Sequence, residues 1–157
     1  MGADIYLKSI FDKNKAEIEP LFDAAVQRRA NATTDTEREA AQQEVAKYYD
    51  ALYAKGYFRD SYNSTSLFAM YGKSWWQLSY DDDGYLPIEE ARRLLADLKI
   101  VGINEAVFHE RFGGRAQNAI GSMSTAEWRE YFEKKRAHLI ALLEQSIELN
   151  EPLYCSV

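Results

Sequence analysis

The fold is decided by residues 124–149, whose sequence is STAEWREYFEKKRAHLIALLEQSIEL. Ser124 and Glu127 form a capping-box pattern, which is typical of the first turn of a helix. Large apolar residues follow at the three- and four-residue spacing of one helix face. They are Trp128, Tyr131, Phe132, Leu139, Leu142, Leu143 and Ile147. The stretch therefore predicts one helix of roughly 37 Å, at about 1.5 Å per residue, which can serve as the spine of the fold.

Two further helices are predicted in the first third of the chain. From Ile10 to Ala30 the apolar residues keep a helical spacing, and because Pro20 interrupts it we expect a kinked or two-piece helix. Thr34 and Glu37 form a second capping box, and Gly56 is a helix stop signal. The short connection between the two helices predicts an antiparallel hairpin. The expected buried face of the second helix is Ala41, Val45, Tyr48, Tyr49, Leu52 and Tyr53.

Three more helices are expected before the spine. Asn63 and Ser64 offer a cap for a helix running through Leu67, Met70, Tyr71, Trp75 and Leu78. Pro87 opens the next, which Gly102 ends, and Asn104 caps a short one reaching Phe112. Residues 113–121 contain three glycines and predict a loop.

These elements predict a mainly α protein, a single-domain bundle of about five to six helices over residues 1–157. The opening residues Ala3 to Leu7 are strand-like in type, so a minor β element at the N-terminus is the alternative for them. No composition shift, linker or internal repeat suggests a domain boundary.

Composition restricts the classes of partner and the compartment. The chain has 25 acidic and 19 basic residues, a net charge of −6, which disfavours nucleic acid as a partner. Cys155 is the single cysteine, so no internal disulfide is expected and a reducing, cytoplasmic location follows. We expect no membrane span, because no run of 18 apolar residues occurs. The aromatic fraction, 13%, is high and suits either a core or a contact surface.

Residues 79–90, SYDDDGYLPIEE, resemble the calcium-binding loop of the EF-hand family. With Gly84 at the turn, the resemblance implies four calcium ligands: Asp81, Asp83, the carbonyl of Tyr85, and a bidentate Glu90. Ser79 stands where the family has its first aspartate, and Pro87 stands at a ligand position. The alternative interpretation is an acidic turn whose carboxylates favour the start of the following helix.

Aromatic and charged residues of the kinds found in protein contacts gather between the second and fourth predicted helices. We take as candidate partner-binding residues Tyr57, Arg59, Asp60, Tyr62, Trp75 and Trp76. Neighbouring helical residues point about 100° apart, so Trp75 and Trp76 cannot both face the core. The alternative is that these aromatics are simply core residues beneath the long helix.

Two segments, residues 2–7 (GADIYL) and 56–63 (GYFRDSYN), look like parts of small uncharacterised bacterial and phage proteins. The resemblance implies a microbial or viral origin and transfers no activity.

Three functions remain open on the sequence. The leading hypothesis is a non-enzymatic acidic helical protein that binds a protein partner, as a phage or bacterial accessory or inhibitor protein. The second is a calcium-binding module built on residues 79–90. The third is a small enzyme whose site forms only in three dimensions, for which a deep pocket lined by His109, Arg59 or Asp60 would be the sign. No catalytic residue and no cofactor other than calcium is assigned.

Overall fold

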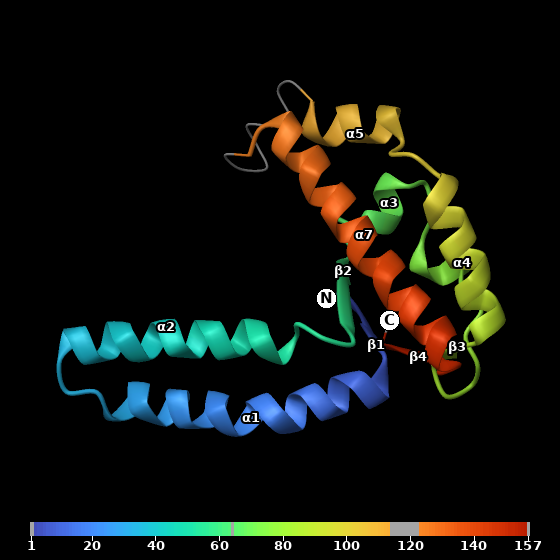
Figure 1. Cartoon of the computed structure of the whole chain (residues 1–157). Helices are drawn as coiled ribbons and strands as arrows, with labels where there is room; N and C mark the ends of the chain where they lie inside the picture. The colour runs from blue at the N-terminus through green and yellow to red at the C-terminus, as the bar shows by residue number, and fades with distance from the viewer. Residues whose placement is uncertain (1, 64, 114–122, 157) are drawn as a thin grey trace. The chain divides into compact units, whose positions relative to one another are not determined.

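The computed structural model describes residues 2–63, 65–113 and 123–156, apart from the side chain of Trp76 (Figure 1). The chain divides into two compact units. Residues 6–57 form one, which we call the hairpin unit, and residues 1–5 with 58–157 form the other, the sheet unit. The division does not show that either part folds independently, so one domain over residues 1–157 stays a prediction.

The hairpin unit consists of α1, Lys8–Asn31, and α2, Asp35–Leu52, packed against each other as the sequence predicts. The capping box at the start of α2 is confirmed, because Thr34 Oγ1 accepts the Glu37 N–H and the Glu37 carboxylate accepts the Thr34 N–H. The two-piece alternative for the first helix is wrong, and a kink at Pro20 stays a prediction. α1 continues through Pro20, because a proline removes only one intrahelical hydrogen bond and this one is exposed to solvent.

The open end of the hairpin is closed by polar contacts within the same unit. The Leu7 N–H donates to the Gly56 carbonyl at 2.8 Å. The buried Asn14 side chain donates to the carbonyls of Ala51 and Leu52 at 2.8 and 3.0 Å. Both carbonyls lie in the last turn of α2, where helical hydrogen bonding is incomplete, so Asn14 holds α1 against that end.

The sheet unit contains a four-stranded sheet with the order β2-β1-β4-β3. Its strands are β1 Gly2–Tyr6, β2 Tyr57–Ser61, β3 Tyr85–Leu86 and β4 Leu153–Ser156. β3 and β4 pair antiparallel, with Leu86 opposite Leu153. The sequence predicted only a minor β element at the N-terminus, and the pure helical bundle is therefore corrected to helices on a small sheet. Strands of two to five residues carry too little periodicity to be recognised alone.

The mainly helical class and the long last helix are confirmed. α7 is Thr125–Leu149, 25 residues, and Ser124 caps it by accepting the Glu127 N–H. α4, Ile88–Ile100, packs along α7, and α5, Glu105–Phe112, begins at the Asn104 cap as predicted. With α1, α2 and α3, the described residues hold six α-helices.

The expected third helix is wrong in its extent. α3 covers only Leu67–Met70 and is capped by Ser66, and a separate 3₁₀ helix, η1, covers Trp75–Gln77. Gly72, at φ 72°, lies in the left-handed region and ends the first piece. Ser64, part of the predicted cap, and residues 114–121 of the predicted loop lie outside the described residues.

The core of the sheet unit lies between the sheet, α4 and α7. Four aromatic rings from α5 and α7 pack at one end, and the centroids of rings in contact lie 4.7 to 6.2 Å apart: Phe108, Phe112, Trp128 and Phe132. Aliphatic side chains continue the core toward the sheet, and the fully buried ones include Ile5, Leu86, Leu139, Leu143 and Leu153. Within the described ranges, no helix is long and apolar enough to cross a membrane.

Cys155 should react slowly with a thiol reagent in the native protein. Its residue is 5% exposed, and burial raises the pKa of the thiol to about 12, so the reactive thiolate is scarce at neutral pH. We expect labelling by Ellman's reagent at pH 8 to be at least about a hundredfold slower in buffer than in 6 M guanidinium chloride. Equal rates in the two solutions would mean that β4 is not packed as described.

Candidate functional site

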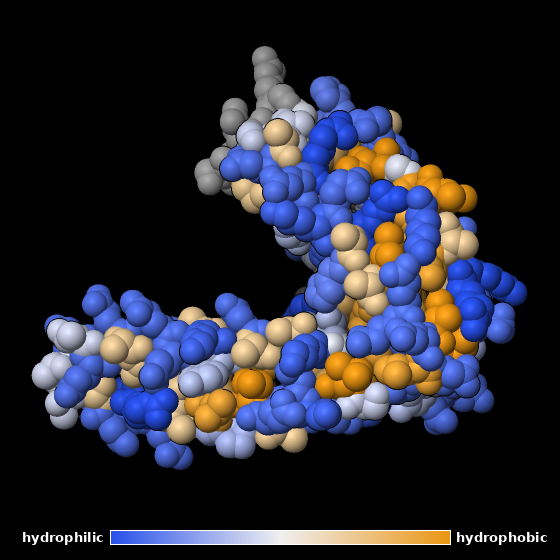
Figure 2. All heavy atoms as spheres, viewed as in Figure 1, coloured by the Kyte–Doolittle hydropathy of each residue, from blue (hydrophilic) through white to orange (hydrophobic). Residues whose placement is uncertain are grey.

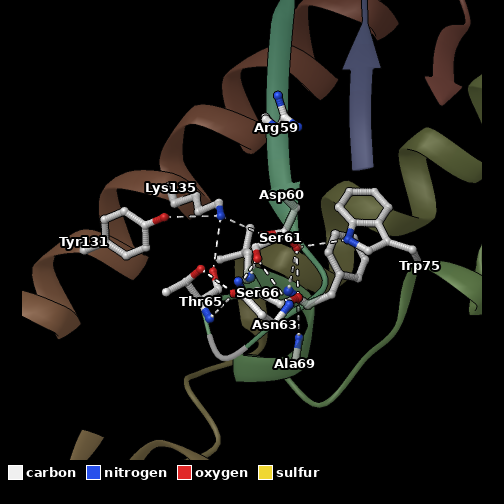
Figure 3. A network of polar contacts seen from close by, with 12 residues as sticks. Arg59, Asp60, Ser61, Asn63, Thr65, Ser66, Ala69, Trp75, Tyr131 and Lys135 are labelled. Atoms are coloured by element: carbon white, nitrogen blue, oxygen red, sulfur yellow. Dashed lines mark hydrogen bonds and ion pairs between the residues drawn. The ribbon is translucent and has the colours of Figure 1, made fainter. Parts of the chain in front are cut away.

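The best-defined polar cluster centres on Asp60, a β2 residue that is 1% exposed (Figure 3). Its carboxylate accepts hydrogen bonds from the Ser66 hydroxyl at 3.1 Å and from the Leu67 and Phe68 N–H groups at 2.8 and 3.3 Å. These groups lie at the start of α3, where backbone donors lack helical partners. Asp60 therefore supplies the acceptors that this short helix needs.

Two side chains from distant parts of the chain complete the cluster. The Trp75 indole N–H donates to Asp60 at 2.9 Å, and the Lys135 ammonium of α7 lies 2.7 Å from the other carboxylate oxygen. Figure 3 shows Trp75 and Lys135 approaching Asp60 from opposite sides. Lys135 also donates to the Thr65 carbonyl at 3.3 Å and to the Tyr131 hydroxyl at 3.4 Å. The cluster joins β2, α3, η1 and α7.

A shallow polar depression of about 220 Å³ adjoins this cluster, lined by Gly2, Arg59, Asp60, Ser61, Tyr131 and Lys135. Its two cations already have anionic partners, because Arg59 lies 3.5 Å from Asp4 and Lys135 pairs with Asp60. A depression whose charges compensate each other offers little net attraction to an ion. The arrangement supports a structural role for Asp60 and Lys135.

The predicted partner-binding residues therefore fall in different environments. Asp60 and Trp75 are brought together but are buried, with Trp75 2% exposed and its ring tilted by 40° against that of Phe68. Arg59 has an exposed side chain, and Tyr62 is 38% exposed. Partial burial, then the nearby carboxylates of Asp4 and Asp60, raise the pKa of Tyr62.

Two predicted residues remain. Tyr57 is 9% exposed and packs in the hairpin unit against the rings of Tyr6, Phe11 and Tyr53. This residue therefore follows the alternative interpretation, in which the aromatics are core residues. The side chain of Trp76 lies outside the described part of the structure, so the expectation that Trp75 and Trp76 do not both face the core stays a prediction.

The acidic turn before α4 has some features of the EF-hand resemblance. Gly84 has φ 85°, and Leu86 lies in β3. Asp81 accepts the N–H groups of Asp83 and Tyr85 at 3.1 and 2.7 Å, and the Tyr85 carbonyl accepts the Asp81 N–H. These contacts belong to the turn itself.

The Glu90 carboxylate, the expected bidentate ligand, pairs with Arg93 at 3.1 Å. No group of three or more His, Cys, Asp or Glu side chains placed to hold a metal ion occurs in residues 2–63, 65–113 and 123–156. Calcium binding by Asp81, Asp83, Tyr85 and Glu90 stays a prediction, and isothermal titration with millimolar calcium tests it.

Sequence reasoning missed a groove on the hairpin unit, which we call the aromatic groove. It has a volume of about 340 Å³ and is lined by residues of both helices together with Tyr6 of β1 and Tyr53, the residue after α2. The lining is Tyr6, Phe11, Lys15, Glu19, Phe22, Asp23, Tyr49, Leu52 and Tyr53. Its rings follow one another along the hairpin. Phe11 lies 6.1 Å from Tyr53, Tyr53 lies 5.2 Å from Tyr49, and Tyr49 lies 6.3 Å from Phe22, between ring centroids.

The sequence contained a partial signal for this groove. Phe11 and Phe22 belong to the helical apolar spacing between Ile10 and Ala30, and Tyr49 and Tyr53 belong to the expected buried face of the second helix. Tyr49 is in fact 52% exposed. Spacing shows that aromatic residues share a helix face, but it does not show whether anything covers that face.

A second groove, of about 650 Å³, lies between the helices near their connection. Small residues line its floor, including Ala24, Ala40 and Ala41, and Arg28 bridges its side through an ion pair with Glu44 at 2.6 Å. The hairpin is thus incompletely filled by its own side chains at this end. Figure 2 shows hydrophobic atoms at the surface of the hairpin among hydrophilic ones.

No family model, no curated protein and no solved structure matches the chain significantly, so the case for a function rests on these sites alone.

Proposed function

We propose that this chain is a non-enzymatic, acidic helical protein that acts by binding a protein partner, as an accessory or inhibitor protein, and that the hairpin unit makes the contact. One observation carries the proposal. The fully described helices α1 and α2, of 24 and 18 residues, bury only Asn14, Ala25, Ala41 and Leu52.

Helices of this length normally derive most of their stability from an apolar face that is covered by tertiary packing. In the hairpin unit three large apolar side chains are instead left exposed, Leu21 at 45%, Val26 at 40% and Tyr49 at 52%. Single exposed apolar residues are ordinary, but Tyr49 lines the aromatic groove, and an exposed ring in an unfilled groove is typical of a contact surface. Helix pairs commonly use such surfaces to bind another helix or segment.

Site-specific photocrosslinking tests the proposal. A benzophenone amino acid is placed singly at Leu21, Val26 or Tyr49 of the full chain, and at Ile100 as the control, since Ile100 is 82% exposed in the sheet unit. We expect illumination of cells that express the protein to give a discrete crosslinked product from the hairpin positions and none from Ile100. Mass spectrometry of the product identifies the partner.

A surface variant provides the second readout. Leu21→Asp should reduce capture of that partner at least about tenfold, because a carboxylate in a buried contact is strongly unfavourable. Its melting temperature should stay near that of the wild type, because Leu21 is already half exposed. No discrete product from any hairpin position, or the same products from Ile100, would overturn the proposal.

A further inference from the structure

We infer that the aromatic groove of the hairpin unit is a binding site for a cationic side chain, arginine or lysine, presented by a segment of the partner. The inference rests on the proposed function and adds the chemistry of the partner to it.

The groove offers exposed ring faces. Phe11, Tyr53, Tyr49 and Phe22 form a continuous row from α1 to α2 and back, and Tyr49 is half exposed. A volume of about 340 Å³ is at the lower end of the range for small-ligand sites and accommodates a guanidinium or ammonium group with its aliphatic stem. Faces of aromatic rings attract cations through the ring quadrupole, most strongly where water is partly excluded.

The groove is also lined by carboxylates. Glu19 and Asp23 of α1 stand at its edge, with Lys15 as the single cation of the lining. Lys15 lies 3.5 Å from Glu19 and so compensates that carboxylate. Among the described residues no Lys, Arg or His nitrogen forms an ion pair with Asp23. The local excess of negative charge favours a cationic occupant.

The chain itself shows the same chemistry elsewhere. Arg129 lies over the Phe108 ring at 4.2 Å and pairs with Glu105 through both of its terminal nitrogens, at 2.9 and 2.5 Å. A guanidinium is thus held by one ring face and one carboxylate. The aromatic groove presents these two kinds of group, Tyr49 and Asp23, from neighbouring helices.

Intramolecular cations also lie near the rings of Tyr48, Tyr71 and Tyr131, each at 5.5 Å. Within the described residues no such cation lies over Phe11, Phe22, Tyr49 or Tyr53. A purely apolar occupant would cover these rings but would also desolvate Asp23 without giving it a partner, which is costly. A cationic side chain makes cation–π contacts with the rings and an ion pair with the Asp23 carboxylate at the same time.

A matched pair of peptides tests the inference on the full chain. The probes are fluorescein-labelled Ala-Ala-Arg-Ala-Ala-Arg-Ala-Ala and the same peptide with citrulline in place of arginine, which keeps the shape and removes the charge. We expect fluorescence anisotropy to give a Kd at least about tenfold lower for the arginine peptide, the size of a partly desolvated cation–π contact with a nearby carboxylate.

Four variants test whether the arginine peptide binds in the groove or is attracted only by the net negative charge of the chain. Tyr49→Leu removes a ring face and Asp23→Asn removes a charge, and each should raise the Kd of the arginine peptide about fivefold or more. Tyr48→Leu and Glu17→Gln are the matched controls, because they make the same changes outside the groove lining. The controls should leave the Kd within about twofold of the wild type.

Equal affinity for the two peptides overturns the inference, and so does an equal loss in the groove and control variants. Either result leaves the proposed function standing if Leu21 and Val26 still crosslink to a partner. If the captured partner is a second copy of this chain, or if its contact does not require a Lys or Arg, the inference is also wrong. Absence of crosslinks with intact peptide selectivity would instead remove the proposed function.

Discussion

Replacing Asp60 with alanine should lower the free energy of unfolding by about 3–5 kcal/mol, the usual cost of removing one partner from a buried ion pair. The change leaves the Lys135 ammonium, whose side chain is 11% exposed, without its carboxylate. It also leaves the Trp75 indole and the N–H groups at the start of α3 without their acceptor. Urea denaturation followed by tryptophan fluorescence measures the loss.

Two further variants define the cause of that loss. Asp82→Ala removes an exposed aspartate and should change stability by no more than about 0.5 kcal/mol. The double variant Asp60→Ala with Lys135→Met removes the stranded cation, so it should lose less than the sum of the two single variants. A loss below about 1 kcal/mol for Asp60→Ala would contradict the buried cluster.

Gly56→Ala should destabilise the protein by about 3 kcal/mol, combining a left-handed backbone with overpacking. Gly56 has φ 63°, and a Cβ built there would lie 2.6 Å from the Phe11 nitrogen and 2.9 Å from the Leu7 carbonyl oxygen. Both neighbours are backbone atoms at the start of α1 and cannot move aside singly. The Leu7–Gly56 hydrogen bond that closes the hairpin would be strained as well. Loss of ellipticity at 222 nm on heating measures the effect.

Variants at two other glycines distinguish the loss of stability caused by backbone strain from the loss caused by the steric clash. Gly72→Ala meets the same conformational cost, at φ 72°, but its nearest neighbour is 3.9 Å away, so the loss should be about 1–2 kcal/mol. Gly102→Ala has neither problem, because nothing lies within 4 Å, and it should be neutral or slightly stabilising. If all three variants behave alike, close packing at Gly56 is not the cause.

The helices could be predicted well from local signals. Thr34 with Glu37 and Ser124 with Glu127 are contacts between residues three apart, so the sequence alone shows where α2 and α7 begin. The hairpin follows for the same reason, because a short connection leaves two neighbouring helices little choice but to pack antiparallel.

The candidate sites were harder to predict because they depend on distant residues. The sequence suggests Asp60 as a partner-binding residue. In the structure Asp60 is buried, because Trp75 and Lys135, 15 and 75 positions away, both bind its carboxylate. Tyr49 was assigned to a buried face, whereas no other element covers it in the hairpin unit. A residue type suggests several roles, and only burial selects among them.

The sequence by itself determined the mainly helical class, the limits of α2, α4, α5 and α7, and the pairing of the first two helices, because caps and periodicity act within a few residues. Tertiary structure alone decided the four-stranded sheet, the polar cluster around Asp60 and the aromatic groove. β4 completes its ladder with β3, nearly 70 residues earlier in the chain, and strand pairing of this kind leaves no local trace in so short a segment. The exposure of the groove rings likewise depends on whether another element packs over their helix face. The spacing of residues along the chain does not contain that information.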